Sequence, residues 1–115
     1  MGAAILKLGK KAVENSAYTI NVLWYDEAGD SMTPTTANWS LVDSNGSIVN
    51  SLSDVAVTTP ATSNNIVLNA TDTAVISGST LKRTAKIVAS YNSTTYGNNL
   101  LLYRDVEFEI DPLSV

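Results

Sequence analysis

The chain contains no histidine and no cysteine among its 115 residues. Without an imidazole or a thiol, it has no Ser-His-Asp or Cys-His catalytic set and lacks the usual ligands of zinc, copper and haem. It can form no disulfide, so its composition carries no mark of an oxidising compartment. These absences exclude most enzyme chemistry. We therefore expect a protein that is not an enzyme and needs no cofactor or metal.

Positive charge and long apolar runs are also scarce. Seven lysines and arginines against eleven acidic residues give a net charge of −4, which is too little basic surface to neutralise phosphates. Near the start, only the short patch Ala3–Leu6 is apolar, and it is too brief for a signal peptide or a membrane span. We expect a soluble protein made in the cytoplasm of its host cell, with no nucleic-acid or membrane partner.

What the chain does have is an alternation of apolar and polar side chains with a period of two, the pattern of half-buried strands. It predicts strands over residues 17–25, 37–41 and 81–91, with Trp39 anchoring the core. In the last predicted strand, acidic residues alternate with apolar ones, so one face is expected inside and the other in solvent. The inward residues predicted for the strand over residues 17–25 are Tyr18, Ile20, Val22 and Trp24. Those predicted for the last strand, which follows residue 99 and ends before Pro112, are Leu102, Val106, Phe108 and Ile110.

Turn signals separate these strands. The pair Asn45-Gly46 predicts a type I′ hairpin, and Pro60 divides two further short strands, over residues 54–58 and 65–69. Thr71 to Thr73, followed by Gly78, predict one helical turn over residues 74–76. Residues 92–99 are expected to form a polar loop.

About seven short strands at regular spacing favour an all-β fold, an immunoglobulin-like antiparallel β-sandwich with one short helical turn. We expect this domain to span residues 17–115. Residues 1–16 follow neither the two-residue period of a strand nor the 3.6-residue period of a helix, and they are predicted to form an N-terminal arm. No repeat or linker indicates a second domain.

Carboxylates are the remaining candidates for chemistry. Asp26, Glu27 and Asp30 are close enough in sequence for a calcium site, and together with Asp43 and Asp54 they contain the two carboxyls that a glycosidase requires. Carboxylates beside glycine and asparagine more often form solvated turns, and that interpretation is favoured here.

Partner-binding residues are predicted in two groups. Tyr25, Tyr96 and Tyr103 are expected to be exposed, where tyrosine serves a protein interface or, alternatively, a carbohydrate platform. The arm mixes apolar and basic residues that suit an acidic neighbour, to which the arm would add as a strand. The arm residues expected to bind are Leu6, Lys7, Leu8, Lys10 and Lys11.

Three segments together resemble small immunoglobulin-like virion proteins of tailed bacteriophages: residues 14–26 (ENSAYTINVLWYD), 37–45 (ANWSLVDSN) and 103–112 (YRDVEFEIDP). The likeness spans nearly the whole predicted domain. It implies a non-catalytic structural protein of the virion, a capsid decoration or head-tail component that binds the major capsid protein or other virion proteins and can form a homo-oligomer. Two alternatives stay open: an adhesive or surface-display module, and a small carbohydrate-binding module.

Overall fold

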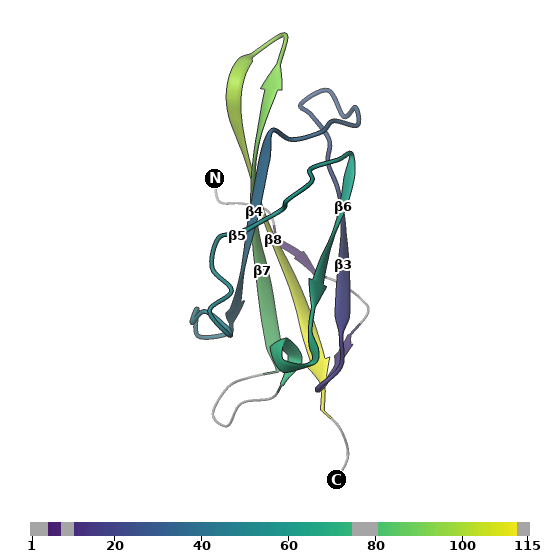
Figure 1. The fold of residues 1–115 in the computed structure, drawn as a ribbon, viewed down its shortest axis with the longest axis vertical. Helices are drawn as coiled ribbons and strands as arrows, with labels where there is room; N and C mark the ends of the chain where they lie inside the picture. Colours follow the sequence, from purple (N-terminus) through teal and green to yellow (C-terminus); the bar gives the residue numbers. More distant parts are fainter. Residues whose placement is uncertain (1–4, 8–10, 75–80, 113–115) are drawn as a thin grey trace.

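The computed structural model describes residues 5–7, 11–74 and 81–112, and the fold is mostly β (Figure 1). Within these residues there are eight strands and one 3₁₀ turn, η1. The strands are β1 (Ile5–Lys7), β2 (Ala12–Val13), β3 (Tyr18–Leu23), β4 (Thr36–Asp43), β5 (Val55–Ala56), β6 (Ser63–Leu68), β7 (Lys82–Ser93) and β8 (Gly97–Asp111), and η1 is Ala70–Thr73.

The strands form a large curled sheet and a small one. The large sheet has the order β1-β8-β7-β4-β5, with β2 also pairing with β8, and the small sheet consists of β3 and β6. Strands β4, β5, β7 and β8 pair antiparallel, as do β3 and β6, whereas β1 and β2 run parallel to β8. The strands after residue 17 pair antiparallel, as predicted, but the large sheet is mixed, because the N-terminal segment predicted to be an arm joins the last strand in the parallel direction.

The core lies between the two sheets. Figure 1 shows β3 and β6 lying across one face of the large sheet. Alternation predicted the inward faces correctly: Trp39 is 8% exposed, and Val106, Phe108 and Ile110 are nearly inaccessible. The buried cluster also contains Tyr18, Ile20, Trp24, Ala37, Leu41, Ile66, Leu68, Ala85, Ile87 and Ala89, with Val22 and Leu102 packed against it. Burying such side chains is the main favourable term in folding.

The predicted polar loop 92–99 is much shorter in the structure. Strands β7 and β8 extend into it and leave only Thr94 to Tyr96 in the turn, with Gly97 at a φ of +105°. This hairpin stands out beyond the other strands (Figure 1), and the molecule measures 55 × 27 × 25 Å. The sequence missed these strand ends because neither face of them is covered, so apolar alternation is absent there.

The Asn45-Gly46 turn differs from its prediction. Only Gly46 has positive φ (+82°), while a type I′ turn needs it at both central residues. The Gly46 amide donates to the Asp43 carbonyl at 3.0 Å, and the returning segment makes only an isolated bridge, Ile48 with Val42. The turn exists where it was predicted, but it is not type I′, and the hairpin partner expected over residues 47–50 is antiparallel to β4 without forming a strand.

One helical turn, η1, lies directly before the residues for which a turn was predicted. It begins at Ala70, and the Asn69 amide donates to the Asp72 carboxylate at 2.7 Å across its start. The predicted turn at residues 74–76 falls mostly outside the described residues. Asp72, expected to precede the helix, is instead a buried acceptor within it.

Parts of the predicted arm are strands. Ile5 to Lys7 pair with Asp105 to Glu107, and Ala12 pairs with Ile110. Ala12 is 1% exposed and belongs to the core cluster. The end of the arm is therefore packed into the domain that follows it.

Candidate binding surfaces

The three predicted tyrosines lie on different parts of the fold. Tyr96 is at the β7–β8 turn and 68% exposed, Tyr103 is on the outer face of β8 and 54% exposed, and Tyr25 follows β3 and is 48% exposed. Tyr25 is held in place by an isolated bridge to Ser31. Tyr96 and Tyr103 thus lie on the same β7–β8 hairpin, whereas Tyr25 lies in the loop that follows β3.

The arm residues lie along the other end of β8. Leu6 and Lys7 belong to β1, whose backbone pairs with Val106 and Glu107. The Lys11 ammonium is 3.8 Å from the Glu109 carboxylate. Leu8 and Lys10 lie outside the described residues.

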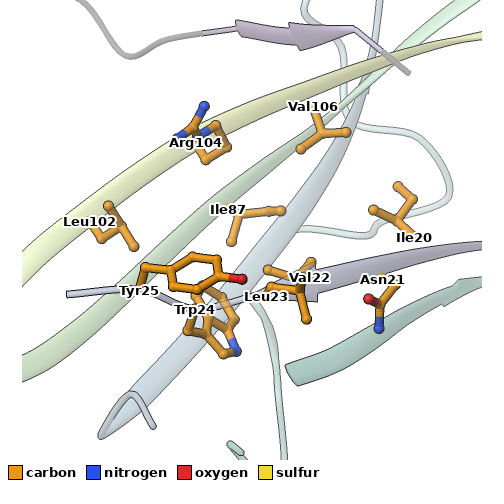
Figure 2. A pocket seen from close by; sticks show the side chains of 10 residues that line it. All are labelled: Ile20, Asn21, Val22, Leu23, Trp24, Tyr25, Ile87, Leu102, Arg104 and Val106. Atoms are coloured by element: carbon orange, nitrogen blue, oxygen red, sulfur yellow. The ribbon is translucent and has the colours of Figure 1, made fainter. Parts of the chain in front are cut away.

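A cleft of about 360 Å³ opens between β3 and the inward faces of β7 and β8. Figure 2 shows Val22 of β3 and Trp24, which follows β3, on one side, with Ile87 of β7 and Leu102 of β8 facing them. Its volume is at the lower end for ligand pockets. The lining residues are Ile20, Asn21, Val22, Leu23, Trp24, Tyr25, Ile87, Leu102, Arg104 and Val106.

Among the described residues, Arg104 is the only charged one that lines this cleft. It occupies an inward position on β8 between Leu102 and Val106, but its side chain is exposed (Figure 2). Among the described residues, no hydrogen bond or ion pair engages its side chain. Two other polar side chains of the lining are hydrogen-bonded: the Trp24 indole donates from Nε1 to Asn64 Oδ1 and the Asn21 carboxamide donates from Nδ2 to Asn65 Oδ1, each at 2.9 Å. The cleft is thus apolar, with one available cation at its edge.

A second, shallower hollow of about 200 Å³ lies on the outer face of the large sheet. Val88 and Leu101 contribute its apolar surface, and Asp54 stands at its edge. Leu101 is 60% exposed. This hollow lies beside Tyr103, which pairs with Val88 across β7 and β8.

The carboxylates of the loop after β3 serve the turn itself. Asp26 Oδ1 accepts the amides of Ala28 and Asp30, each at 2.9 Å. In the described part of the chain, no group of three acidic residues is arranged to hold a metal ion. These contacts are those of the solvated turn that the sequence favoured.

Tyr91, at an inward position late in β7, lies near the same loop. Desolvation is the main reason that the pKa of its hydroxyl is raised. The carboxylates of Glu27 and Asp26 add to this effect, since negative charge opposes ionisation of a phenol, and Glu27 also hydrogen-bonds the hydroxyl. Tyr91 therefore ties the loop to the base of the projecting hairpin.

Lysines of neighbouring segments partly neutralise the acidic row on β8, which consists of Asp105, Glu107, Glu109 and Asp111. Lys86 contacts Asp105 at 3.2 Å, and Lys82 contacts Glu107 at 3.9 Å, both across the β7–β8 pair. The lysine side chains are about half exposed, so each contact contributes little, roughly 0–1 kcal/mol. The row is better explained as a solvated face than as a binding site.

Arg83 is a buried cation, and its burial was not predicted from the sequence. It is 1% exposed, and its guanidinium donates to the carbonyls of Lys82 and Ala74, both at 3.0 Å. Desolvation lowers the pKa of Arg83, and the charge of Asp43 opposes that shift. The period of two could have revealed its inward position, since Arg83 lies two residues before the buried Ala85 on the same strand.

No protein-family model, no curated protein and no solved structure matches this chain. Among the residues that the structure describes, no helix is both long and apolar enough to cross a membrane.

Proposed function

We propose that this chain is an immunoglobulin-like sandwich and a non-catalytic structural protein of a tailed-phage virion, a capsid decoration or head-tail component. The strand order supports the first part. A sheet of β8, β7, β4 and β5 facing β3 and β6 corresponds to strands G, F, C and C′ facing B and E in variable-type immunoglobulin domains. The buried Trp39 on β4 corresponds to the tryptophan that those domains place on strand C.

The assembly role is carried by one observation, the projecting β7–β8 hairpin. From Ile87 to Tyr103 the chain has no charged residue, and the outer part of the hairpin that these residues form, beyond the pairing of Ser90 with Thr36 of β4, extends past the rest of the sheet (Figure 1). Depletion of charge combined with exposed aromatic side chains is typical of the centre of a protein interface. Tyr96, Leu101 and Tyr103 are all more than half exposed on this hairpin. A shape of this kind suits insertion between neighbouring subunits of a shell.

The arm adds a second contact in this proposal. Among the described strands, β1 lies at the edge of the large sheet and pairs with β8 alone, so in this proposal its other side pairs with a neighbouring virion protein. Extending the sheet across a subunit boundary would fix the domain in one orientation, because backbone pairing sets the register.

The test is to locate the protein in particles. Antiserum raised against the pure protein would be used for immunogold labelling of phage particles purified from induced cultures of the source organism. We expect regular labelling of the head or the head-tail junction. Particles that lack the protein, together with specific hits on a glycan array, would replace the virion role with carbohydrate binding.

A matched pair of variants tests the hairpin. Tyr96→Ala removes the most exposed aromatic ring, and Thr94→Ala alters the same turn without removing a ring. We expect Tyr96→Ala to reduce binding to particles that lack the protein, with Thr94→Ala unchanged. Equal binding by both variants would exclude the tip as the contact.

A further inference from the structure

We propose that the cleft beside β3 accepts an extended acidic peptide segment of another protein, which pairs with the free edge of β3 and places a carboxylate against Arg104. This inference does not depend on the virion assignment. It rests on three features that converge on one place: an unpaired strand edge, an apolar cleft and an available cation.

The strand edge comes first. Among the described residues, β3 pairs only with β6. The Trp24 amide donates to the Thr62 carbonyl at 3.1 Å, on the β6 side. Backbone groups alternate in direction along a strand, so those of Thr19, Asn21 and Leu23 point away from β6. The edge therefore offers a row of amides and carbonyls to a further strand.

Strand β3 itself lacks the features of sequence and register that usually protect an open edge. Natural proteins guard open edges with charged side chains, proline or a bulge. Strand β3, with the sequence YTINVL, contains neither a charge nor a proline, and its register with β6 is regular from end to end. The edge of β8, by contrast, is covered by β1 and β2 over parts of its length. An edge left open in this way is suited to pairing.

The cleft would take the side chains of an added strand. A third strand beside β3 would project every second side chain toward Ile87, Leu102 and Val106, which line the opposite wall (Figure 2). The volume of about 360 Å³ suits a few aliphatic side chains. A compact apolar ligand would fill the same space but would leave the edge of β3 unpaired. The combination therefore favours an extended peptide.

Arg104 sets the charge of that peptide. Its guanidinium is exposed at the cleft, and no described carboxylate neutralises it. A guanidinium binds a carboxylate through paired hydrogen bonds that are stronger than neutral ones. We infer that the bound segment alternates apolar residues with small polar ones and carries an Asp or Glu at an inward position near one end.

The test uses synthetic probes with blocked ends. Two seven-residue peptides alternate threonine with valine, and glutamate replaces either the first or the last valine. Binding is followed by amide chemical shifts and by hydrogen exchange of the protein. We expect one of the two to bind, with shifts at the cleft and slower exchange of the amides of Thr19, Asn21 and Leu23. Absence of binding by both, or shifts located elsewhere, would overturn the proposal.

Charge reversal tests Arg104. We expect Arg104→Glu to weaken the glutamate peptide about tenfold or more and to favour a lysine counterpart. Lys86→Gln is the matched control, since it removes a cation from the outer face of the same sheet and should leave affinity unchanged. If the glutamate and lysine peptides bind the natural protein equally well, the carboxylate contact is wrong.

N-methylated peptides test the backbone pairing without changing the protein. If the added strand is antiparallel to β3, methylation of the threonine amides should abolish binding and methylation of the valine amides should not. Parallel pairing reverses this result, because the inward residues then donate to β3. If methylation of the threonine amides and methylation of the valine amides both leave binding unchanged, no strand is added to β3.

Two other occupants would overturn the proposal. A dimer that the peptide dissociates in sedimentation experiments would show that a second copy of this chain fills the cleft. Peptide binding that is seen only after deletion of residues 1–4 would show that the chain's own first residues compete for it.

Discussion

The rings of Tyr18 and Phe108 stack with centroids 4.6 Å apart and planes inclined by 29°. Tyr18 is the first residue of β3 in the small sheet, and Phe108 lies in β8 of the large sheet, so this pair joins the two sheets. Both residues are buried, at 7% and 1% exposure. Aromatic pairs contribute beyond the area they bury, about 0.5–1.5 kcal/mol.

Replacing one ring of this pair should be costly. We expect Phe108→Ala to lower the free energy of unfolding by about 3–5 kcal/mol, since it leaves a cavity at the junction of the sheets. Urea denaturation followed by fluorescence of the two tryptophans measures the loss. Tyr96→Ala at the hairpin tip is the control and should change stability little. A loss below that of an ordinary surface variant would show that the sheets do not depend on this contact.

The Asp72 carboxylate organises the crossing from β6 to β7. It is 6% exposed and accepts the Asn69 amide at 2.7 Å and the Asn50 carboxamide at 2.9 Å. Asp72→Ala leaves these donors without their acceptor, so we expect a loss of about 1–3 kcal/mol in urea denaturation. Asp72→Asn keeps one acceptor oxygen and should lose less. Asp30→Ala, in an exposed turn, is the control; a similar loss there would argue against a specific role for Asp72.

Stability should decline in alkaline solution. Desolvation raises the pKa of Tyr18, and desolvation with nearby carboxylates raises that of Tyr91, from an ordinary value of 10.0. The folded state therefore holds these protons more tightly than the unfolded chain does. Their contribution is complete below about pH 10 and is lost as the pH rises through the folded pKa values. Melting temperatures between pH 8 and 11.5 should show this decline.

The variant Tyr91→Phe separates the two tyrosines. It removes one group with a raised pKa, so the alkaline decline in melting temperature should become shallower. An unchanged slope would mean that Tyr91 titrates alike in the folded and unfolded states.

Deletion of the arm tests its proposed contact, and the end point of the deletion matters. Removing residues 1–13 would also remove Ala12, a core residue paired with Ile110. Removing residues 1–10 keeps Lys11 and Ala12 and takes away β1. We expect this shorter variant to stay folded, by circular dichroism, and to lose binding to particles that lack the protein. Undiminished binding would refute the arm contact.

Much of the fold could be predicted from local patterns. Trp39, Phe108 and Ile110 were correctly assigned to the core because each lies in a strand with one buried face. The ends of β7 and β8 were missed because both of their faces meet solvent, so no alternation marks them. The cleft could not be predicted either. It depends on β3, Arg104 and Ile87 meeting in space, although they are far apart in the sequence.

The sequence by itself determined that this chain is rich in strands, which side of most strands faces inward, and that imidazole and thiol chemistry are absent. These properties are local, since they follow from residue type and a period of two. Only the tertiary structure decided that the first strands run parallel to the last, that β3 keeps an open edge and that Arg104 stands over an apolar cleft. Such features arise when strands distant in the chain pack together, and no periodicity within one segment encodes which strands become neighbours.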